Sequence, residues 1–178
     1  MAVFALIHAA AVDSWYWHPL TAELQDRGQD VVAVDLPVDD DAAGLSEYAA
    51  TVVEAVGTRR DVVVVGHSFG GFTAPLVAQL VSAGLLIMLQ AQIPAPGEAP
   101  WPLTAWPAVR TRVLLSRGDR FLPLEFMRRV TRDRLHLEPD VMPGDHCPML
   151  GHPTEVADRL VAYHRSLGTT APGARTPN

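Results

Sequence analysis

Short runs of apolar residues recur along the chain, with amphipathic segments between them. Each run is too short for a helix, and most are rich in β-branched residues, which favours strands. Because the runs are continuous rather than alternating, they are typical of a parallel sheet that is covered on both faces. The predicted strands are Val3–Ile7, Val31–Val34, Val62–Val65, Leu85–Leu89 and Val113–Leu115, with a less regular sixth near Glu138–Met142.

The segments between the strands carry the signals of helices. One helix is expected over residues 15–27, with Gly28 placed to end it. Pro75 lies inside the helix expected after the third strand, where it removes a hydrogen bond and predicts a kink or a late start. Ser46 is expected to cap a further helix, and Pro153 suits the first turn of the last one. The expected buried positions of these helices are Trp17, Leu20 and Leu24; Ala49, Val52, Val53 and Val56; and Val156, Leu160 and Tyr163.

Strands that alternate with helices imply βαβ units with right-handed crossovers. The predicted fold class is therefore α/β, with a doubly wound, mostly parallel sheet of about six strands. The chain has 178 residues, of which 48% are hydrophobic, and this suits one domain, expected over residues 1–167. Residues 168–178 are rich in Gly, Pro and Thr and are expected to form a disordered tail.

Charge and cysteine content narrow the classes of partner and compartment. A net charge of −6 without a run of Lys or Arg argues against nucleic acid and anionic membranes, since both need cationic neutralisation. Cys147 is the single cysteine, so no intramolecular disulfide can form, and a cytoplasmic location is expected. The apolar segment Met1–Val12 lacks the cationic start of a signal peptide, and no apolar run reaches the roughly 18 residues needed to span a membrane.

Doubly wound sheets bind ligands beyond the carboxyl ends of their strands. This rule selects candidate site residues before any motif is considered. They are His8, Ala9 and Ala10; Asp35; Gly66–Gly71; Gln90–Pro94; Ser116–Arg120; and Gly144–Cys147.

Ser68 is the candidate nucleophile among them. Gly66-His67-Ser68-Phe69-Gly70-Gly71 is a G-x-S-x-G motif between a predicted strand and a predicted helix. Such a turn is sharp, so a strained backbone is expected at the serine, and side chains at the flanking glycines would crowd it. Free N–H groups at the start of the following helix could stabilise a developing oxyanion. The alternative is a glycine-rich strand-to-helix turn without chemistry.

A serine hydroxyl needs a general base at neutral pH, and seven histidines are available. Hydrolases with this elbow present the serine, then an acid and then a histidine along the chain. His146 fits this order, because its turn-rich loop follows the last predicted strand and precedes the final helix. His152 is expected to be a cap or surface residue, His164 lies inside a helix, and His67 is expected to point away from Ser68. The alternative for His146 is a plain loop histidine.

Asp119 is the candidate acid, because it follows the fifth predicted strand and a glycine. From there a carboxylate can reach a histidine on the next loop, hold the imidazole tautomer and stabilise the imidazolium. Alternatively, Asp119 caps the helix near Pro123 or pairs with Arg117 or Arg120. The less suitable carboxylates are Asp145, which adjoins His146, and Asp35, which suits a turn or packing role.

Together these segments resemble the α/β-hydrolase superfamily, and most closely its subgroup of plant methyl esterases and hydroxynitrile lyases. The resemblance covers residues 3–167 with one gap. Its specific part is the elbow with the Asp and His loops, whereas the strand patterns are generic. The matching segments are His8-Ala9-Ala10-Ala11-Val12-Asp13-Ser14-Trp15, Val32–Pro37, Gly66–Gly71, Arg117-Gly118-Asp119 and Gly144-Asp145-His146.

The resemblance implies an oxyanion hole formed by the backbone N–H groups of Phe69 and Ala10. The family's glycine after the first histidine is Ala9 here. If that position needs a positive φ, alanine would cost about 1 kcal/mol and could shift the Ala10 amide. The helical lid that relatives insert between the fourth and fifth predicted strands is expected to be nearly absent, because the segment 90–111 is short and proline-rich.

Without a developed lid, the site is expected to be open and bordered by partly exposed apolar side chains, Phe69 and Phe72 among them. Either a bulky substrate or a second copy of the chain, in a homodimer, would then cover it. The alternative is that individual aromatic residues fill the core. The residues expected to contact substrate are Ala9, Trp15, His67, Ile93, Trp101 and Phe121.

The sequence thus predicts a serine esterase that cleaves an ester of a small to medium apolar substrate through Ser68, His146 and Asp119. Neither a metal nor an organic cofactor is expected. One alternative is a lyase or cyclase of a biosynthetic pathway that uses the same three groups for acid–base chemistry. A second alternative is a catalytically silent binding protein on the same fold.

Overall fold

Six strands form the central sheet of the computed structural model, which describes residues 1–97 and 101–168. They are β1 (Val3–Ile7), β2 (Asp30–Ala33), β3 (Val62–Ser68), β4 (Leu85–Ala91), β5 (Thr111–Ser116) and β6 (Asp140–Met142). Their order in the sheet is β2-β1-β3-β4-β5-β6, and every neighbouring pair is parallel. Each predicted apolar run overlaps a strand, although β2 ends at Ala33, before Val34, and β6 begins only at Asp140. The prediction of a doubly wound α/β fold is confirmed.

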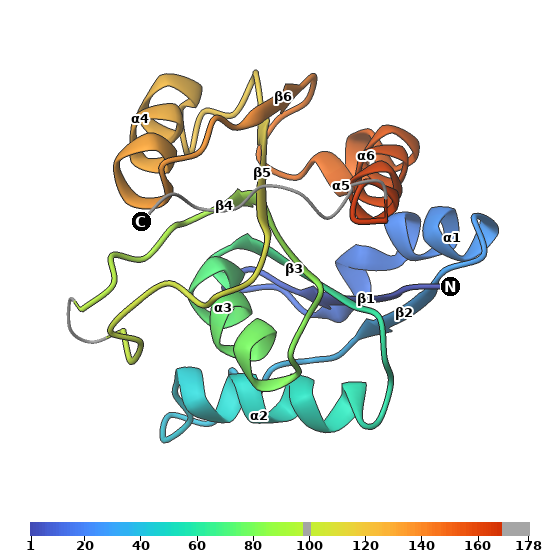
Figure 1. Cartoon of the computed structure of the whole chain (residues 1–178), viewed down its shortest axis with the longest axis vertical. Helices are drawn as coiled ribbons and strands as arrows, with labels where there is room; N and C mark the ends of the chain where they lie inside the picture. Colours follow the sequence, from blue (N-terminus) through green and yellow to red (C-terminus); the bar gives the residue numbers. More distant parts are fainter. Residues whose placement is uncertain (98–100, 169–178) are drawn as a thin grey trace, which may run out of the picture.

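Helices cover both faces of this sheet (Figure 1). They are the 3₁₀ helix η1 (Ser14–Trp17) and the α-helices α1 (His18–Asp26), α2 (Leu45–Val56), α3 (Gly70–Leu80), α4 (Leu124–Leu135), α5 (Pro148–Gly151) and α6 (Pro153–Arg165). α1 and α6 pack together on one face, and α2 and α3 pack together on the other. Met127 of α4 belongs to the same core cluster as the buried residues of α2 and α3.

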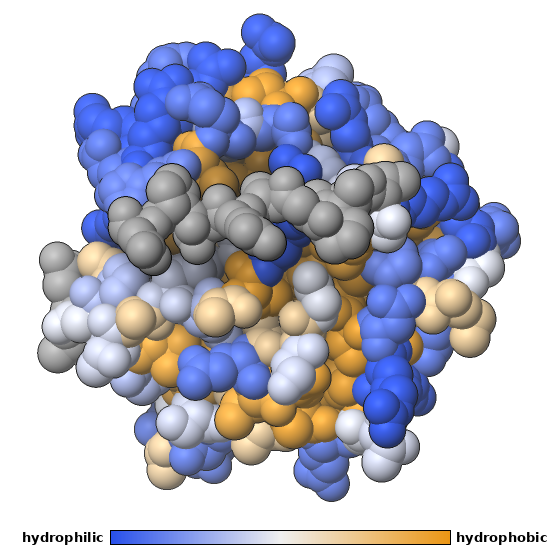
Figure 2. All heavy atoms as spheres, in the orientation of Figure 1, coloured by the Kyte–Doolittle hydropathy of each residue, from blue (hydrophilic) through white to orange (hydrophobic). Residues whose placement is uncertain are grey.

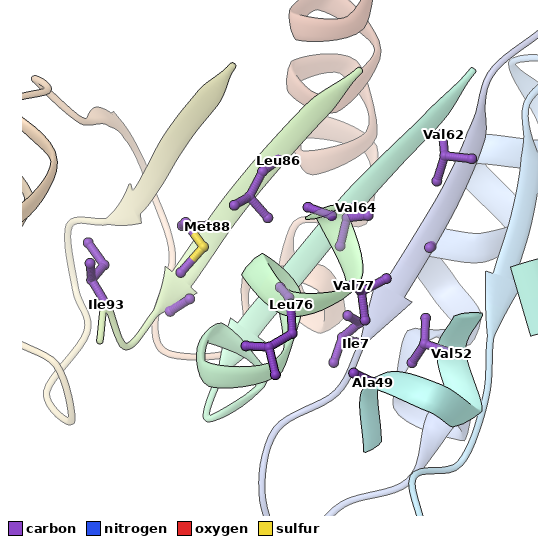
Figure 3. Packing of buried hydrophobic residues seen from close by; sticks show 14 of the residues in the cluster. Ile7, Ala49, Val52, Val62, Val64, Leu76, Val77, Leu86, Met88 and Ile93 are labelled. Carbon is purple, nitrogen blue, oxygen red and sulfur yellow. The ribbon is translucent and has the colours of Figure 1, made fainter. Parts of the chain in front are cut away.

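Successive residues of a strand point to opposite faces, which divides the core into two layers. Ala5 and Ile7 of β1 pack in the layer with α2 and α3, whereas Phe4 and Leu6 pack in the layer with α1 and α6. Figure 3 shows part of the first layer, where side chains of the strands meet those of α2 and α3. Because both faces are covered, β1, β3 and β4 are buried along their whole length, as their continuous apolar runs predict.

The start of α2 differs from the prediction. The helix begins at Leu45 and is capped by Gly44, whose N–H donates to a carboxylate oxygen of Glu47 at 2.8 Å. Ser46 therefore lies inside the first turn and is not the cap. The Glu47 carboxylate satisfies the N–H of the cap residue, as the third helical residue does in a capping box, and its charge also suits the positive end of the helix.

The helix predicted over residues 15–27 begins as the 3₁₀ turn η1, and the α-helix starts only at His18. Gly28 ends it as predicted, with a φ of +72° that glycine adopts at little cost. The late start predicted for the helix that contains Pro75 is wrong, because α3 begins at Gly70 and runs through the proline.

The connection from β4 to β5 contains no helix in its described residues, 92–97 and 101–110. This confirms that a large lid is absent. Trp15, Phe69 and Phe121 are exposed, and Figure 2 shows further hydrophobic residues at the surface in the part of the view where α2 and α3 lie in Figure 1. Across residues 1–97 and 101–168, no helix combines the length and the apolar character needed to cross a membrane.

The end of α6 at Arg165 lies just before the predicted domain boundary at residue 167. Residues 169–178 of the predicted tail lie outside the described residues. The single domain over residues 1–167 stays a prediction. The sheet order reverses between β1 and β3, so the carboxyl end of β3, where Ser68 lies, is at the topological switch point where doubly wound sheets bind ligands.

Candidate active site

Ser68 lies at a sharp turn between β3 and α3. Its φ is +49°, in the left-handed region that costs a non-glycine residue about 1 kcal/mol or more, so the predicted backbone strain is confirmed. A Cβ on Gly66 would lie 2.6 Å from the Cβ of Ala74, and a Cβ on Gly70 would lie 2.6 Å from the Ile7 carbonyl oxygen. The two flanking glycines are therefore required for α3 to approach the sheet and to hold the serine in this conformation.

The hydroxyl of Ser68 lies 2.9 Å from Nε2 of His146, and Nδ1 of His146 lies 2.7 Å from Oδ2 of Asp119. A carboxylate only accepts hydrogen bonds, so the proton of the neutral imidazole is on Nδ1 and donates to Asp119. Nε2 is then the acceptor for the Ser68 hydroxyl. The three side chains form one hydrogen-bonded relay, in which the Asp119 side chain is fully buried and the serine is 6% exposed.

Asp119 also organises its own loop. Its second oxygen, Oδ1, accepts the backbone N–H groups of Phe121 at 2.6 Å and Leu122 at 2.9 Å. These bonds fix the carboxylate in a turn before α4, whose own cap is Pro123. Within the described part of the chain, no ion pair joins Asp119 to Arg117 or Arg120. One oxygen thus holds the turn, and the other faces the histidine.

Gln90 holds the acid loop from the neighbouring strand, a role that sequence reasoning missed. The register of β4 against β3 shifts at this residue, since His67 pairs with Leu89 and Ser68 with Ala91. The fully buried Gln90 has a φ of +44°; its side-chain carbonyl accepts the Ser116 N–H at 2.6 Å, and its amide donates to the Leu122 carbonyl at 3.0 Å. The bulge therefore aims one amide side chain at both ends of the Asp119 loop.

His67 is fully buried and makes two hydrogen bonds with groups other than Ser68. Its ring lies 2.6 Å from the Tyr16 hydroxyl through Nδ1 and 2.7 Å from the His146 carbonyl oxygen through Nε2. Burial lowers the pKa of His67 to about 4, and burial also raises the pKa of Tyr16 above its ordinary range. Because its side chain is enclosed in the core, the prediction that His67 contacts substrate is wrong.

His152 and His164 lie as predicted, away from the relay. His152 is exposed and takes the position before α6 without a side-chain capping bond, and His164 lies inside α6, where it bonds to Asp61. Asp145 accepts the backbone N–H of Cys147 at 3.0 Å rather than facing the imidazole.

The loop after β1 brings Ala9 and Ala10 to the same edge as Ser68. Ala9 does not have a positive φ; the left-handed residue of this loop is Ala11, with a φ of +59°. Alanine at position 9 is therefore not strained, and its φ gives no reason for the Ala10 amide to shift. Asp35, which is exposed, accepts the Ser14 N–H at 2.7 Å and so ties this loop to the end of β2.

One hollow is lined by Phe69, the residue after Ser68, and another is lined by relay residues. The first, of about 380 Å³, is mostly apolar. The other, of about 460 Å³, opens beside Asp119 and His146 and includes Phe121, whose ring centroid is 4.9 Å from that of His146. The first is lined by Leu45, Phe69, Phe72, Pro94, Ala95, Trp101 and Arg134.

Of the remaining residues expected to contact substrate, two line these hollows. Trp101 lines the apolar hollow despite being only 6% exposed, and Phe121, 68% exposed, lines the other. Ile93 is only 2% exposed and packs in the core beside α3 (Figure 3), so the expectation that it contacts substrate is corrected. Ala9 and Trp15 line neither hollow, and the exposed Trp15 ring stacks on His18. Over residues 1–97 and 101–168, no three His, Cys, Asp or Glu side chains group closely enough to hold a metal ion.

Comparison with known proteins decides the family. A family model described as the alpha/beta hydrolase family matches residues 4–101, which is more than half of the chain. The chain belongs to the α/β-hydrolase family. A solved pyrethroid hydrolase superposes on this α/β hydrolase with a TM-score of 0.82, covering 96% of this chain and 100% of that one at 15% identity, which is a likeness of fold.

Curated relatives of this α/β hydrolase carry both esterase and other names. Norfluorocurarine synthase 1 from Strychnos sp is 33% identical over 86 residues, 43% of this chain and 32% of the relative. Methylesterase 7 from Arabidopsis thaliana is 32% identical over 88 residues, 43% of this chain and 34% of the relative. Alpha-hydroxynitrile lyase from Arabidopsis thaliana is 29% identical over 113 residues, 54% of this chain and 42% of the relative. The chain thus spans well under half the length of each of these relatives.

Proposed function

We propose that this α/β hydrolase is a serine esterase in which Ser68 is the nucleophile, His146 the general base and Asp119 the acid that orients the base. The observation that carries the proposal is the relay from the Ser68 hydroxyl through His146 to Asp119, with distances of 2.9 Å and 2.7 Å. Hydrogen-bond reach between nucleophile and base, and between base and carboxylate, is the geometry that activates a serine. The methylesterase among the relatives supports ester substrates.

In the proposed reaction, the Ser68 oxygen attacks the ester carbonyl carbon and its proton passes to Nε2 of His146. The tetrahedral intermediate collapses, the imidazolium gives the proton to the leaving alkoxide, and an acyl group stays on the serine. Water then attacks the acyl carbon, with His146 taking one of its protons and returning it to the Ser68 oxygen. Asp119 keeps Nδ1 protonated and stabilises the imidazolium in both halves.

The oxyanion would be held by the backbone N–H groups of Phe69 and Ala10. Phe69 lies directly at the start of α3, where the helix dipole places partial positive charge. Ala10 lies on the loop after β1, against which Gly70 packs without space for a side chain. Donors fixed at the place where negative charge develops typically contribute the largest share of such catalysis.

The apolar hollow beside Phe69 supports a small to medium apolar group on one side of the scissile ester. Its volume of about 380 Å³ lies within the range of pockets that bind small molecules. The test is turnover of p-nitrophenyl acetate, butyrate and hexanoate, with mass spectrometry of quenched samples to find the acyl group on Ser68. If the folded wild-type chain hydrolysed none of the three esters, the esterase proposal would be contradicted.

Filling the apolar hollow should change chain-length preference. In Ala95→Phe, a ring replaces a methyl on the wall of the hollow, so hexanoate should be excluded more than acetate. We expect the ratio of kcat/KM for hexanoate over acetate to fall about tenfold. Ala50→Phe, on the exposed side of α2, is the matched control and should leave the ratio unchanged. An unchanged ratio in Ala95→Phe would show that the acyl chain binds elsewhere.

A lyase or cyclase is the second candidate function. It is favoured by the names of two relatives, a hydroxynitrile lyase and a norfluorocurarine synthase. In such an enzyme the serine and histidine would move a proton without forming an acyl-enzyme. A chain whose Ser68 reacts with a fluorophosphonate but which hydrolyses none of the three esters would favour this candidate.

A homodimer that covers the open site stays a prediction. Exposed aromatic side chains flank the relay, since Phe69 is 38% exposed and Phe121 68%. Large exposed apolar groups commonly mark a binding surface. Sedimentation velocity over a concentration series should show a reversible monomer–dimer equilibrium, and Phe121→Ser should shift it toward monomer. A monomer at every concentration would remove the homodimer.

A further inference from the structure

Tyr16 and His67 form a series of buried hydrogen bonds beside the relay, and neither side chain belongs to the relay. Tyr16 comes from η1 and is 6% exposed, and His67 comes from the end of β3 and is 0% exposed. The Tyr16 hydroxyl lies 2.6 Å from Nδ1 of His67, and the ring of Trp17 packs edge-on against the same imidazole. Two polar side chains in such a place cost free energy of folding unless their hydrogen bonds are satisfied.

The direction of each hydrogen bond in this series follows from the carbonyl oxygen of His146, which is the acceptor at one end. The His146 carbonyl oxygen, 2.7 Å from Nε2 of His67, can only accept, so Nε2 carries the proton. Burial lowers the pKa of His67 to about 4, so the imidazole is neutral and Nδ1 is an acceptor. The Tyr16 hydroxyl must then donate to Nδ1, which leaves its oxygen free to accept the Ala9 N–H at 3.2 Å.

Both ends of this series finish on backbone groups of loops that carry the proposed machinery. One end is the N–H of Ala9, which precedes the residue proposed to stabilise the oxyanion. The other is the carbonyl of His146, the residue proposed as the base. The loops lie far apart in sequence, and the buried side chains of Tyr16 and His67 connect them directly.

We propose that Tyr16 and His67 are positioning residues that set the distance between the oxyanion loop at Ala9–Ala10 and the base loop at His146. The proposal rests on the proposed function. Neither side chain touches the reacting atoms, and both act through backbone groups. A shift of a few tenths of an ångström in the Ala10 amide matters little to substrate binding but weakens stabilisation of the transition state, where the charge on oxygen is greatest.

The test removes one hydroxyl. Tyr16→Phe keeps the ring that packs against Trp17 and His67 but removes both the acceptor for Ala9 and the donor to Nδ1. The matched control is Tyr163→Phe, which removes a buried hydroxyl that donates to Asp140 at 2.7 Å, at the far end of the sheet. We expect kcat for p-nitrophenyl acetate to fall at least about tenfold in Tyr16→Phe, with KM within about twofold of wild type. Tyr163→Phe should change neither.

A fall in kcat of less than about fivefold relative to Tyr163→Phe, or a change confined to KM, would overturn the proposal. Two double variants test the bond to the base loop separately. His67→Gln can keep the donor to the His146 carbonyl, so adding it to Tyr16→Phe should cost little more activity, whereas His67→Ala should lower kcat further. Equal losses in the two double variants would contradict a role for the base-loop bond.

A measurement on the unmodified chain needs no catalysis. Two-bond ¹H–¹⁵N NMR spectra should show His67 as the neutral tautomer protonated at Nε2, and an Nδ1-protonated ring would overturn the proposed chain of hydrogen bonds. Failure of this inference differs from failure of the esterase proposal. If Ser68→Ala keeps its activity, the proposed function fails; if Ser68→Ala is inactive while Tyr16→Phe is as fast as wild type, only the positioning role fails.

Discussion

Ser68→Ala should abolish hydrolysis of p-nitrophenyl esters, with kcat lower by at least about 10⁴-fold. The variant removes the only atom proposed to bond with the acyl carbon, and the base 2.9 Å away then has no hydroxyl to deprotonate. The oxyanion donors stay in place, so a small residual rate above the uncatalysed one is expected. KM should change little, since the serine side chain is 6% exposed and contributes little to binding.

Ser68→Gly separates the chemistry from the strain. Ser68 has a φ of +49°, which strains alanine as it strains serine but does not strain glycine. Ser68→Gly should therefore be as inactive as Ser68→Ala but more stable than it by about 1 kcal/mol. Chemical denaturation of both variants and of Ser46→Ala, an exposed serine in α2, measures the difference. Ester turnover in Ser68→Ala close to that of wild type would refute the nucleophile.

Asp119→Asn should lower kcat about 10³- to 10⁴-fold while leaving the fold intact. The Asn carbonyl can still accept the N–H groups of Phe121 and Leu122, so the turn survives. The amide NH₂ then faces Nδ1 of His146, which must become an acceptor, and the imidazole proton moves to Nε2. A protonated Nε2 cannot accept the Ser68 proton. The three side chains would keep their positions, but the imidazole would be in the wrong tautomer.

Asp145→Asn is the matched control for the loss of one carboxylate beside His146. Among the described residues, its side chain accepts the Cys147 N–H alone, which an Asn carbonyl can also do, so kcat should stay within about threefold of wild type. Comparable losses in the two variants would mean that charge near the imidazole matters more than the tautomer. Retention of wild-type kcat in Asp119→Asn would remove Asp119 as the orienting acid.

The sequence was sufficient for the sheet and for the three relay residues. Continuous β-branched runs such as Val62–Val65 leave few alternatives to buried parallel strands, and the ends of such strands share one edge of the sheet. Chain order then left His146 and Asp119 as the partners that could reach the serine. The structure brings these three side chains together, with the spacing that a relay requires.

What supports the relay could not be predicted from local pattern. Gln90 faces the acid loop only because a bulge shifts its register in β4, and nothing in the residues around it signals an irregular ladder. Tyr16 lies among apolar neighbours in an aromatic segment, where a tyrosine typically serves packing alone. Its hydroxyl meets His67 only once η1 is folded against the end of β3, a contact between residues 51 apart in sequence.

Burial of single aromatic and aliphatic residues was also beyond the sequence. Ile93 and Trp101 follow β4 in a proline-rich segment that has no periodicity to indicate an inward face. A Cβ on Gly71 would lie 2.1 Å from the carbonyl oxygen of Gln92, so the chain just before Ile93 passes directly against α3. The Trp101 indole N–H donates to the Phe72 carbonyl at 2.9 Å. These contacts join residues far apart in sequence, so no local pattern signals them.

Labelling with a fluorophosphonate probe, followed by peptide mass spectrometry, reports whether Ser68 is activated by His146 and Asp119. We expect rapid, stoichiometric modification of Ser68 in the wild-type chain, and slow modification in Asp119→Asn and His146→Ala, because the probe requires a serine activated by its base. Modification of Ser68 at the same rate in all three proteins, or of a different residue in the wild type, would contradict this expectation.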